Sequence, residues 1–223
     1  MLTITMDPHP LLHAICFTTH FPMPIGELPQ PEWLTDLLKP EPTLAPVPLA
    51  PVSEEYRKSI RQLLRFGGFK PSGRSKPASE YLVRAANANE LPPINGAVDV
   101  LNAVSLHGGM AIGVIDLNLC RPPLHIAIGQ PGEHYVFNAS GQDMELKGLI
   151  CLYDQDGPCA NPVKDSQRTK TNPSTTDTLT IMWGSNDDPQ RTIDAASWYR
   201  QLLSQLGAST EDAEVRVAER PQA

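Results

Sequence analysis

The chain has 223 residues, 40% of them hydrophobic, and a formal net charge of −7; one main domain is therefore expected, and bulk attraction to nucleic acid is not. No segment has the roughly 20 successive apolar residues of a membrane helix, and the apolar run 11–17 is short and interrupted by His13, which argues against membrane insertion and secretion. The four cysteines are scattered without a C-x-x-C pair, which predicts a reducing, cytoplasmic location.

The first part of the chain predicts a small N-terminal section joined to the main body by a proline-rich linker. Residues 11–17 are typical of a buried strand and residues 32–38 of a short helix. Five prolines between positions 40 and 51 remove backbone donors and fix φ, which excludes a helix or a central strand there. We expect an N-terminal strand and helix that pack on the body at residues 1–39 and a linker at residues 40–52. The main domain would follow at residues 53–207 and a flexible acidic tail at residues 208–223.

Three helices are predicted at the start of the main domain. Ser53 can cap the first helix, whose acidic first turn and apolar stripe end at the Gly67-Gly68 pair. The second helix begins at Pro77 and the third near Asn95. The residues expected to face inward from the third helix are Val98, Leu101 and Val104.

The rest of the domain has the period of strands. Short apolar runs separated by Gly, Pro, Asn and Asp clusters predict five strands, at residues 112–117, 124–128, 134–138, 149–153 and 179–183. A final helix over residues 190–206 is expected to bury Ile193 and either Trp198 or Tyr199. Helices first and strands second predict an α+β domain.

Basic residues are concentrated between positions 57 and 84, where eight of them occur with a single acid. A chain polarised in this way can orient an anionic ligand although its overall charge is negative. We therefore predict an RNA-binding face, and the alternative is a set of ordinary solvated helix charges. The residues assigned to RNA binding are Arg57, Arg61, Arg65, Lys70 and Arg74.

Several polar residues are candidates for chemistry. Asn102 lies inside the third predicted helix, where its amide is expected either to tie the helix to a loop or to contact a ligand. Asp116 follows a strand and is interpreted first as a turn or capping residue. Cys159 lies in a polar loop whose acids would raise the pKa of its thiol, which weakens a cysteine-nucleophile mechanism. Asp165 and Ser166 line either a pocket or a solvated loop.

Two other kinds of site are not expected. Residues 68–75 differ by one residue from a phosphate-loop pattern, but a helix precedes them, Pro71 removes one donor, and Arg74 replaces the lysine. These departures argue against an ATP site. His125 and His134 have no third partner at ligand spacing, so the sequence predicts no metal and no cofactor.

The blocks 76–82, 93–102 and 109–116, with a Val-Asp-x-x-Asn pattern that ends at Asn102, resemble the B3/B4 domain in the beta subunit of phenylalanyl-tRNA synthetase. The order of motifs follows that domain from Tyr56 to Trp183. The resemblance implies an α+β fold of the B3/B4 (PheT/TilS-like) kind, with helices packed on a sandwich-like, mostly antiparallel sheet system. In the synthetase, this domain binds the mischarged 3′ end of tRNA and hydrolyses tyrosine from it.

The resemblance also implies site residues. Asn102 falls where the family has a pocket asparagine. Gly113 stands where the family usually has a histidine, and Met182 stands where a glutamate follows the threonine-bearing strand. A glycine would enlarge the pocket and a methionine would remove a polar anchor, which favours a more apolar acyl group than tyrosine.

The predicted function is binding of tRNA or aminoacyl-tRNA, with hydrolysis of mischarged aminoacyl-tRNA in trans. Asn102 and Ser105 would orient water and stabilise a developing oxyanion. A non-catalytic RNA-binding module with a degenerate site, and a small-molecule hydrolase or binder, are the alternatives; a complete aminoacyl-tRNA ligase is not expected. The residues expected to bind substrate are Lys76, Glu80, Arg84, Gly113, Asp116, Cys159, Asp165 and Ser166.

Overall fold

The computed structural model describes residues 1–218 and gives an α+β domain built on one large sheet. The strands of this sheet are β1 (Thr3–Met6), β2 (Leu12–His20), β3 (Ala111–Asp116), β4 (Leu124–Ile128), β7 (Ile150–Asp154), β8 (Gly157–Ala160), β9 (Asp177–Ser185) and β10 (Ser209–Val217). Their order is β3-β9-β2-β10-β1-β4-β7-β8, and the pairs that β1 forms with β10 and β4 are parallel while the others are antiparallel. A separate hairpin joins β5 (His134–Val136) to β6 (Asp143–Glu145).

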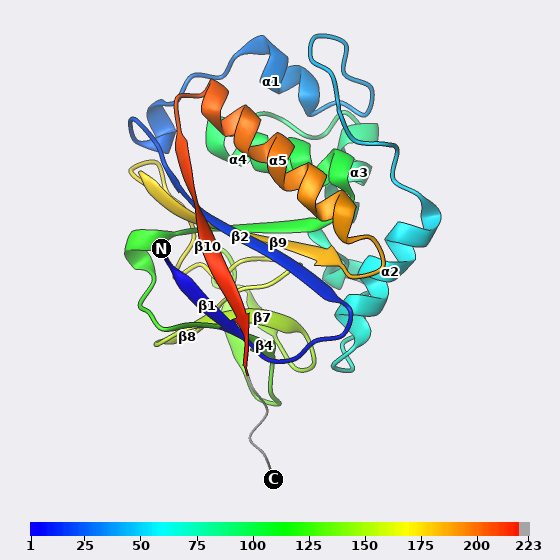
Figure 1. Cartoon of the computed structure of the whole chain (residues 1–223), viewed down its shortest axis with the longest axis vertical. Coiled ribbons are helices and arrows are strands. Elements are labelled where there is room, and N and C mark those ends of the chain that lie inside the picture. Colours follow the sequence, from blue (N-terminus) through cyan, green and yellow to red (C-terminus); the bar gives the residue numbers. More distant parts are fainter. Residues whose placement is uncertain (219–223) are drawn as a thin grey trace.

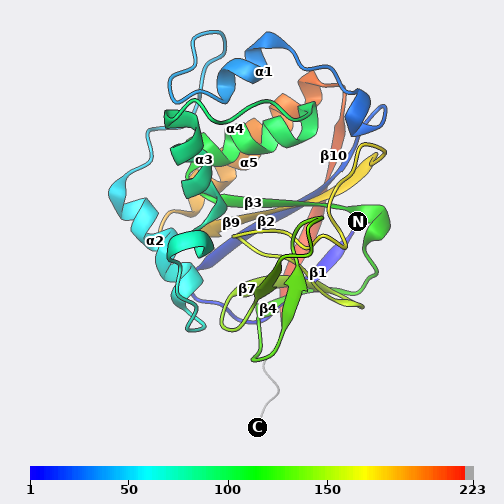
Figure 2. The same cartoon turned by 180° about the vertical axis from the view of Figure 1, so that it is seen from behind.

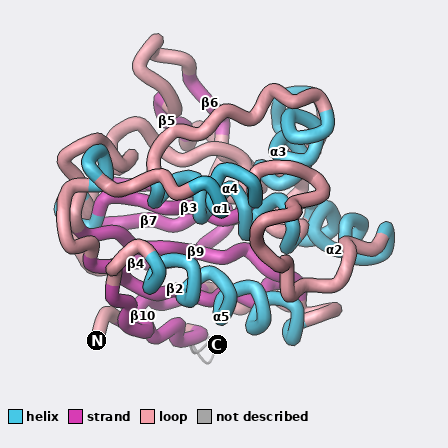
Figure 3. The backbone as a smooth tube through the Cα atoms, turned by 90° about the horizontal axis from the view of Figure 1, so that it is seen from above, coloured by secondary structure: helices cyan, strands magenta, loops and turns pink. Residues whose placement is uncertain are grey.

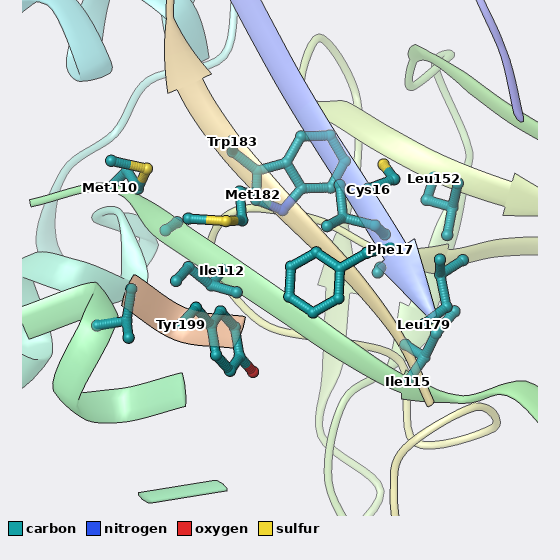
Figure 4. Packing of buried hydrophobic residues seen from close by; sticks show 14 of the residues in the cluster. Cys16, Phe17, Met110, Ile112, Ile115, Leu152, Leu179, Met182, Trp183 and Tyr199 are labelled. Carbon is teal, nitrogen blue, oxygen red and sulfur yellow. The ribbon is translucent and has the colours of Figure 1, made fainter. Parts of the chain in front are cut away.

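The sheet folds over into two layers. In Figure 2, β3, β9 and β2 form an upper layer, and β4 and β7 lie below it. Buried side chains fill the space between the layers and the space between the upper layer and the helices, where the rings of Phe17 and Tyr199 meet edge to face with centroids 5.3 Å apart. Figure 4 shows Trp183, Cys16 and Leu152 in the same buried cluster. The predicted sandwich-like, mostly antiparallel sheet system is confirmed.

The helices cover the upper layer from the other side. They are α1 (Glu32–Leu37), α2 (Glu54–Arg65), α3 (Ala78–Asn87), α4 (Gly96–Gly108) and α5 (Pro189–Gln205). In Figure 1, α4 and α5 lie together on one side of β2 and β9, and α1 lies beyond them. Figure 2 shows α3 and α2 beside the end of β3. The helices α3 and α4 both contact β3, which is the outermost strand of the sheet.

Local capping signals explain where the helices begin and end. The Ser53 hydroxyl accepts a hydrogen bond from the backbone N–H of Tyr56 at the start of α2, as predicted. At the start of α4, Asn95 Oδ1 accepts from the backbone N–H of Val98. Gly109 ends α4 with a φ of 77°, in the left-handed region that glycine adopts without steric cost. The chain can therefore turn directly from α4 into β3.

Helix burial differs from the prediction in two places. In α5, both Trp198 and Tyr199 are buried, while Ile193 is 45% exposed. In α4, Leu101 and Val98 are only partly buried. Because α4 contacts α1, α3, α5 and β3, the buried residues of this helix lie on several of its sides and not only along the predicted stripe. The fully buried residues of α4 include Val100, Ala103 and Val104.

The N-terminal segment belongs to the main sheet. β2 lies between β9 and β10 and pairs with both of them, so the strand expected at residues 11–17 is part of the main sheet, and α1 is the helix expected at residues 32–38. Residues 40–52 contain no helix or strand. They are tied back to the domain because the backbone N–H groups of Thr43 and Leu44 donate to the Asp36 carboxylate.

The acidic C-terminal segment is a central strand, which corrects the prediction of a flexible tail at 208–223. The first half of β10 pairs with β2 and the second half with β1. Its acidic residues Glu211 and Asp212 are exposed, while Ala213 is buried. Acidic side chains at exposed positions are compatible with strand pairing, but their acidic composition made the sequence resemble a flexible tail. The predicted tail also includes residues 219–223, which lie outside the described residues.

The backbone of β10 gives the first testable prediction. The N–H of Glu214 donates to the backbone carbonyl of Leu2, 2.8 Å away. Glu214→Pro removes that donor inside the sheet and is expected to lower the free energy of unfolding by about 3 kcal/mol or more, the scale of a proline inside a regular element. Glu214→Ala keeps the N–H and loses only an exposed ion pair with Arg216, so it should lower the free energy of unfolding much less than the proline variant does. Chemical denaturation of both variants measures the difference, and equal stabilities would contradict the role of β10.

Candidate functional site

A cleft of about 1020 Å³ lies where α3 and α4 meet the outer edge of β3. The β5–β6 hairpin closes the same region, and Figure 3 shows this hairpin and α3 along the same edge of the molecule. The residues that line the cleft are Gly73, Arg74, Lys76, Ala78, Tyr81, Leu82, Arg84, Leu101, Asn102, Ser105, Ile112, Gln142, Val163 and Lys164. The fold thus brings together residues from α3, α4, β3 and the loop that follows β8.

The charged residues of this cleft are all basic. Arg74, Lys76, Arg84 and Lys164 line it, and no carboxylate of residues 1–218 belongs to its lining. Burial lowers the pKa of Lys164, and the nearby charges of Arg74 and Lys170 lower it further. The Lys164 ammonium lies 3.8 Å from the centroid of the Phe137 ring. The cleft is therefore suited to an anionic ligand.

Asn102 places a polar side chain in the wall of the cleft. It is only 8% exposed, it projects from α4, and it lines the cleft. None of the hydrogen bonds within residues 1–218 involves its side-chain amide. The amide is not among the buried side-chain groups that lack a partner in residues 1–218, so it is open to the cleft, where water or a ligand can bind it, and the structure offers no loop tie for Asn102.

Ser105 has a structural partner. Its hydroxyl donates to the backbone carbonyl of Met110, 2.7 Å away, and the residue is 1% exposed. This bond braces the turn from α4 into β3. Although Ser105 lines the cleft, its proton is held by the backbone, so the structure gives it a bracing role that the sequence did not predict.

Tyr81 lines the cleft but was not predicted as a site residue. Its hydroxyl donates to the backbone carbonyl of Gly73 at 2.9 Å, which holds the ring at the cleft wall. The Arg84 guanidinium lies 5.6 Å from the ring centroid. Lys164 and Gln142 were also missed, because they follow strands that are distant in sequence from α3. An aromatic residue between basic residues was the available signal for Tyr81.

Two further hollows adjoin the cleft. One of about 450 Å³ between α2 and α3 shares Arg84 with it, and one of about 540 Å³ beneath the β5–β6 hairpin shares Arg74 and Lys164. The hairpin hollow is also lined by the rings of Phe69 and Phe137. Through these shared residues the cations of the three hollows form a row across this side of the domain, here called the basic route, although Glu54 and Glu80 also line the first hollow and Asp143 and Glu145 the hairpin hollow.

The predicted RNA-binding residues are distributed along this route. Arg57, Arg61 and Arg65 line the hollow between α2 and α3. Arg61 forms two hydrogen bonds of 2.5 and 2.6 Å with the Glu80 carboxylate, so its charge is partly neutralised, and Glu80 acts as its partner. Arg74 lines the main cleft and the hairpin hollow, whereas the exposed Lys70 lines none of the three.

Gly113 and Met182 do not line the cleft. A methyl group added at Gly113 would lie 3.0 Å from Asp165 Oδ1, on the side of β3 away from the cleft-lining Ile112. Met182 is fully buried in the core, where it pairs with Ile112 across the sheet (Figure 4). The expectation that these two residues enlarge the pocket and remove an anchor is therefore wrong for this cleft.

The structure corrects the prediction for Cys159. This residue lies in β8 and is fully buried, instead of in an exposed loop, and its thiol donates to the backbone carbonyl of Leu152 at 3.4 Å. A hydrogen bond with Cys120 and burial raise the pKa of the Cys159 thiol far above its usual value. A thiol held protonated in the core is neither a nucleophile nor a substrate contact.

Asp116 and Ser166 support loops outside the cleft. The Asp116 carboxylate accepts hydrogen bonds from the backbone N–H of Asn118 at 2.9 Å and from the Thr175 hydroxyl at 2.6 Å. This confirms the capping interpretation of Asp116. Ser166 is 2% exposed, and its hydroxyl accepts from the backbone N–H of Arg168 at 3.2 Å. Neither residue is placed to contact a ligand in the cleft.

Asp165 is held against the free edge of β3. Its Oδ2 accepts from the backbone N–H of Val114 at 3.3 Å, while its buried Oδ1 has no hydrogen-bond partner among residues 1–218. Burial raises the pKa of this carboxyl to about 7, although the nearby charge of Lys170 opposes the shift. Asp165 is therefore a buried group that exchanges a proton near neutral pH.

No group of three or more His, Cys, Asp and Glu residues within residues 1–218 is arranged to hold a metal ion. No helix in the same range is both long enough and apolar enough to cross a membrane.

Comparison with known proteins identifies relatives of this fold. The family model for the B3/4 domain matches residues 68–197, and no curated protein matches the chain. An N-terminal fragment of the phenylalanyl-tRNA synthetase beta subunit from Pyrococcus horikoshii superposes with a TM-score of 0.52 and 12% identity, covering 97% of this chain and 52% of that fragment. The chain thus spans about half the length of the fragment, and the likeness shows the fold alone. The C-terminal domain of TilS matches 34% of this chain and 71% of its own length, with 15% identity and a TM-score of only 0.31.

The raised pKa of Asp165 predicts a specific pH dependence of stability. The unfolded carboxyl has a pKa of 3.8 and the folded one a pKa of about 7, so the folded state binds the proton more tightly. Its contribution to stability is fully present below pH 3.8 and is lost as the pH rises through about 7. Asp165→Asn cannot lose this proton, so its stability relative to the unmodified protein should increase as the pH rises from acidic to alkaline values. Melting temperatures across this range measure the effect. The control Asp187→Asn removes the same charge at an exposed position, and a parallel pH profile for both variants would contradict the prediction.

Proposed function

The chain belongs to the B3/4 domain family, and from the cleft that this fold carries we propose that it binds the acceptor end of tRNA. The favoured ligand is an aminoacyl-tRNA, and the proposed reaction is hydrolysis of a wrongly attached amino acid in trans. The observation that carries the proposal is the unpaired amide of Asn102, which lies in a cleft whose charged residues are all cations.

The basic route supports an RNA ligand. Its cations are spread over three adjoining hollows, so an extended chain of phosphates would meet more of them than a single small anion. Tyr81 in the cleft, and Phe69 and Phe137 in the hairpin hollow, offer rings on which unpaired bases can stack. Basic and aromatic side chains arranged in this way are typical of single-stranded nucleic-acid sites.

The apolar part of the cleft supports an aminoacyl ligand. Leu82, Leu101, Ile112 and Val163 contribute apolar surface beside Asn102. A ligand that carries phosphates at one end and an apolar side chain at the other would use both kinds of wall. An apolar amino acid esterified to the terminal ribose has this composition, and uncharged RNA would leave the apolar part unused.

The proposed chemistry depends on positioning. Water adds to the ester carbonyl carbon, the acyl C–O bond breaks, and the ribose hydroxyl leaves with a proton from that water. The developing oxyanion would be stabilised by the Asn102 amide. Within residues 1–218, the lining of this cleft includes no Asp, Glu, His or Cys, so no side chain with an ordinary pKa near neutrality acts as a general base. This composition favours, as a second candidate, an RNA-binding module that does not hydrolyse its ligand, and a panel of mischarged tRNAs distinguishes the two by deacylation rate.

Asn102→Ala tests the central residue of the site. Since no hydrogen bond to Asn102 is lost within the described chain, the melting temperature should change little. Deacylation, or affinity for an aminoacyl-adenosine analogue if the protein does not hydrolyse, should fall by about tenfold or more. Both quantities are measured on the same preparation. A destabilised variant whose folded fraction keeps full activity or affinity would show that Asn102 is structural.

Charge reversal at the cleft tests RNA binding. Arg74 and Arg84 are exposed residues that line the shared boundaries of the hollows. The double variant Arg74→Glu, Arg84→Glu should fold normally, bind tRNA at least about tenfold more weakly, and show a salt dependence whose slope is smaller by about 1 to 2. Arg121→Glu with Arg216→Glu makes the same change in net charge at exposed positions that line none of the three hollows. Equal loss in both double variants would refute a localised site, and absence of any tRNA binding by the unmodified protein would favour the small-molecule alternative.

A further inference from the structure

The outer edge of β3 is open at one residue. β3 is the terminal strand of the large sheet and pairs only with β9 in it. Such an edge presents backbone N–H and C=O groups that lack a neighbouring strand. Because successive residues of a strand direct these groups to alternate sides, every second residue of β3 faces the open edge.

Most of this edge is closed by the chain itself. The N–H of Asp116 donates to the backbone carbonyl of Thr169 at 2.8 Å, and Ile115 forms an isolated bridge with Lys170. The N–H of Val114 donates to Asp165 Oδ2. The two donors at positions 114 and 116 therefore point to the open edge and are both satisfied.

Ile112 is the next residue in this series. The register with β9 runs without interruption from Ala111 to Asp116, so the N–H and C=O of Ile112 point to the same edge as those of Val114 and Asp116. No hydrogen bond to either group occurs among residues 1–218. Ile112 lines the cleft that contains Asn102. The covered part of the β3 edge thus ends at Ile112, beside the cleft.

We propose that the backbone of Ile112 holds the aminoacyl group of the ligand as a one-residue extension of the sheet, an inference that rests on the proposed function. The Ile112 N–H donates to the carbonyl oxygen of the aminoacyl ester. The Ile112 carbonyl accepts a hydrogen bond from its α-amino group. An antiparallel strand residue pairs with its opposite neighbour through the same two groups, and extended peptides bind to open sheet edges in this way.

The composition of the cleft supports this assignment. An α-ammonium group needs an acceptor, and the lining includes no carboxylate within the described residues. A backbone carbonyl is the neutral acceptor that the open edge provides. Side chains project perpendicular to the hydrogen-bonding plane of a sheet, so the amino-acid side chain would leave that plane toward one wall of the cleft. Asn102, from a helix, and the Ile112 N–H, from a strand, would then both approach the ester. Ile112 would therefore recognise the aminoacyl group and not the RNA.

The test removes the backbone donor and keeps the rest of the strand. Ile112→Pro deletes the N–H at a position of an edge strand where proline is tolerated, and Ile112→Ala removes most of the side chain but keeps the N–H. The probes are amide-linked 3′-aminoacyl adenosines with apolar side chains, which cannot be hydrolysed, and an uncharged acceptor-stem RNA. Relative to Ile112→Ala, the proline variant should bind the aminoacyl adenosines about tenfold more weakly, as expected for loss of a hydrogen bond to a desolvated group. Both variants should bind the uncharged RNA alike.

The outcomes separate this inference from the proposed function. If circular dichroism shows that Ile112→Pro is unfolded, replacement of Ile112 by its α-hydroxy acid removes the same N–H with the side chain intact, and the same loss of affinity is expected. Unchanged affinity for the aminoacyl adenosines in a folded variant that lacks the N–H overturns the inference while RNA binding stands. If the unmodified protein binds neither the aminoacyl adenosines nor the uncharged RNA, the proposed function is overturned and this inference with it.

Discussion

The structure depends on the pairing of β10 with two strands from the opposite end of the chain. β10 joins β2 on one side and β1 on the other, so it connects the layer that carries the helices to the layer that contains β4 and β7. Without this strand the sheet would divide between β2 and β1. The helices α3 and α4 contact β3 at the far end of the same sheet, and the position of the cleft therefore depends on contacts made far from it.

Charge is segregated in this fold, which explains how an acidic protein can carry a basic site. The net charge is −7, yet the cleft and its two neighbouring hollows collect basic residues from α2, α3 and the segments 73–76 and 163–164. An overall negative charge reduces unspecific attraction to polyanions, so binding would be confined to the basic route. The pairing of Arg61 with Glu80 limits the charge of the hollow between α2 and α3, and Asp143 and Glu145 limit that of the hairpin hollow. Among residues 1–218, the lining of the main cleft includes no acid.

The unpaired edge of β3 is largely covered by another segment of the chain. Backbone groups at an open edge invite pairing with another chain, and here the segment from Asp165 to Lys170 covers that edge except beside the cleft. The cover includes the Asp165 carboxyl, whose Oδ1 has no hydrogen-bond partner in the described part of the chain and whose pKa is raised by burial. A buried carboxyl of this kind lowers the stability of the folded state at alkaline pH, where it ionises. It lies against β3, next to the proposed ligand site.

The sequence by itself determined the features that depend on neighbouring residues. Ser53 capped its helix as predicted because capping involves residues only three positions apart. The apolar period located six of the strands, namely β2, β3, β4, β5, β7 and β9, and the order of helices and strands indicated the α+β class. The resemblance in residues 76–116 identified the family, and it directed attention to Asn102. What the sequence could not determine were contacts between distant segments: the strand formed by the acidic residues 209–217, the burial of Cys159, and the placement of Lys164 and Tyr81 in one cleft. Gly113 was assigned to the pocket by its position in a motif, but its side of β3 is set by pairing with β9. Only the tertiary structure decided these points, because hydrogen-bond partners and burial are properties of the assembled sheet and are not encoded in the local pattern.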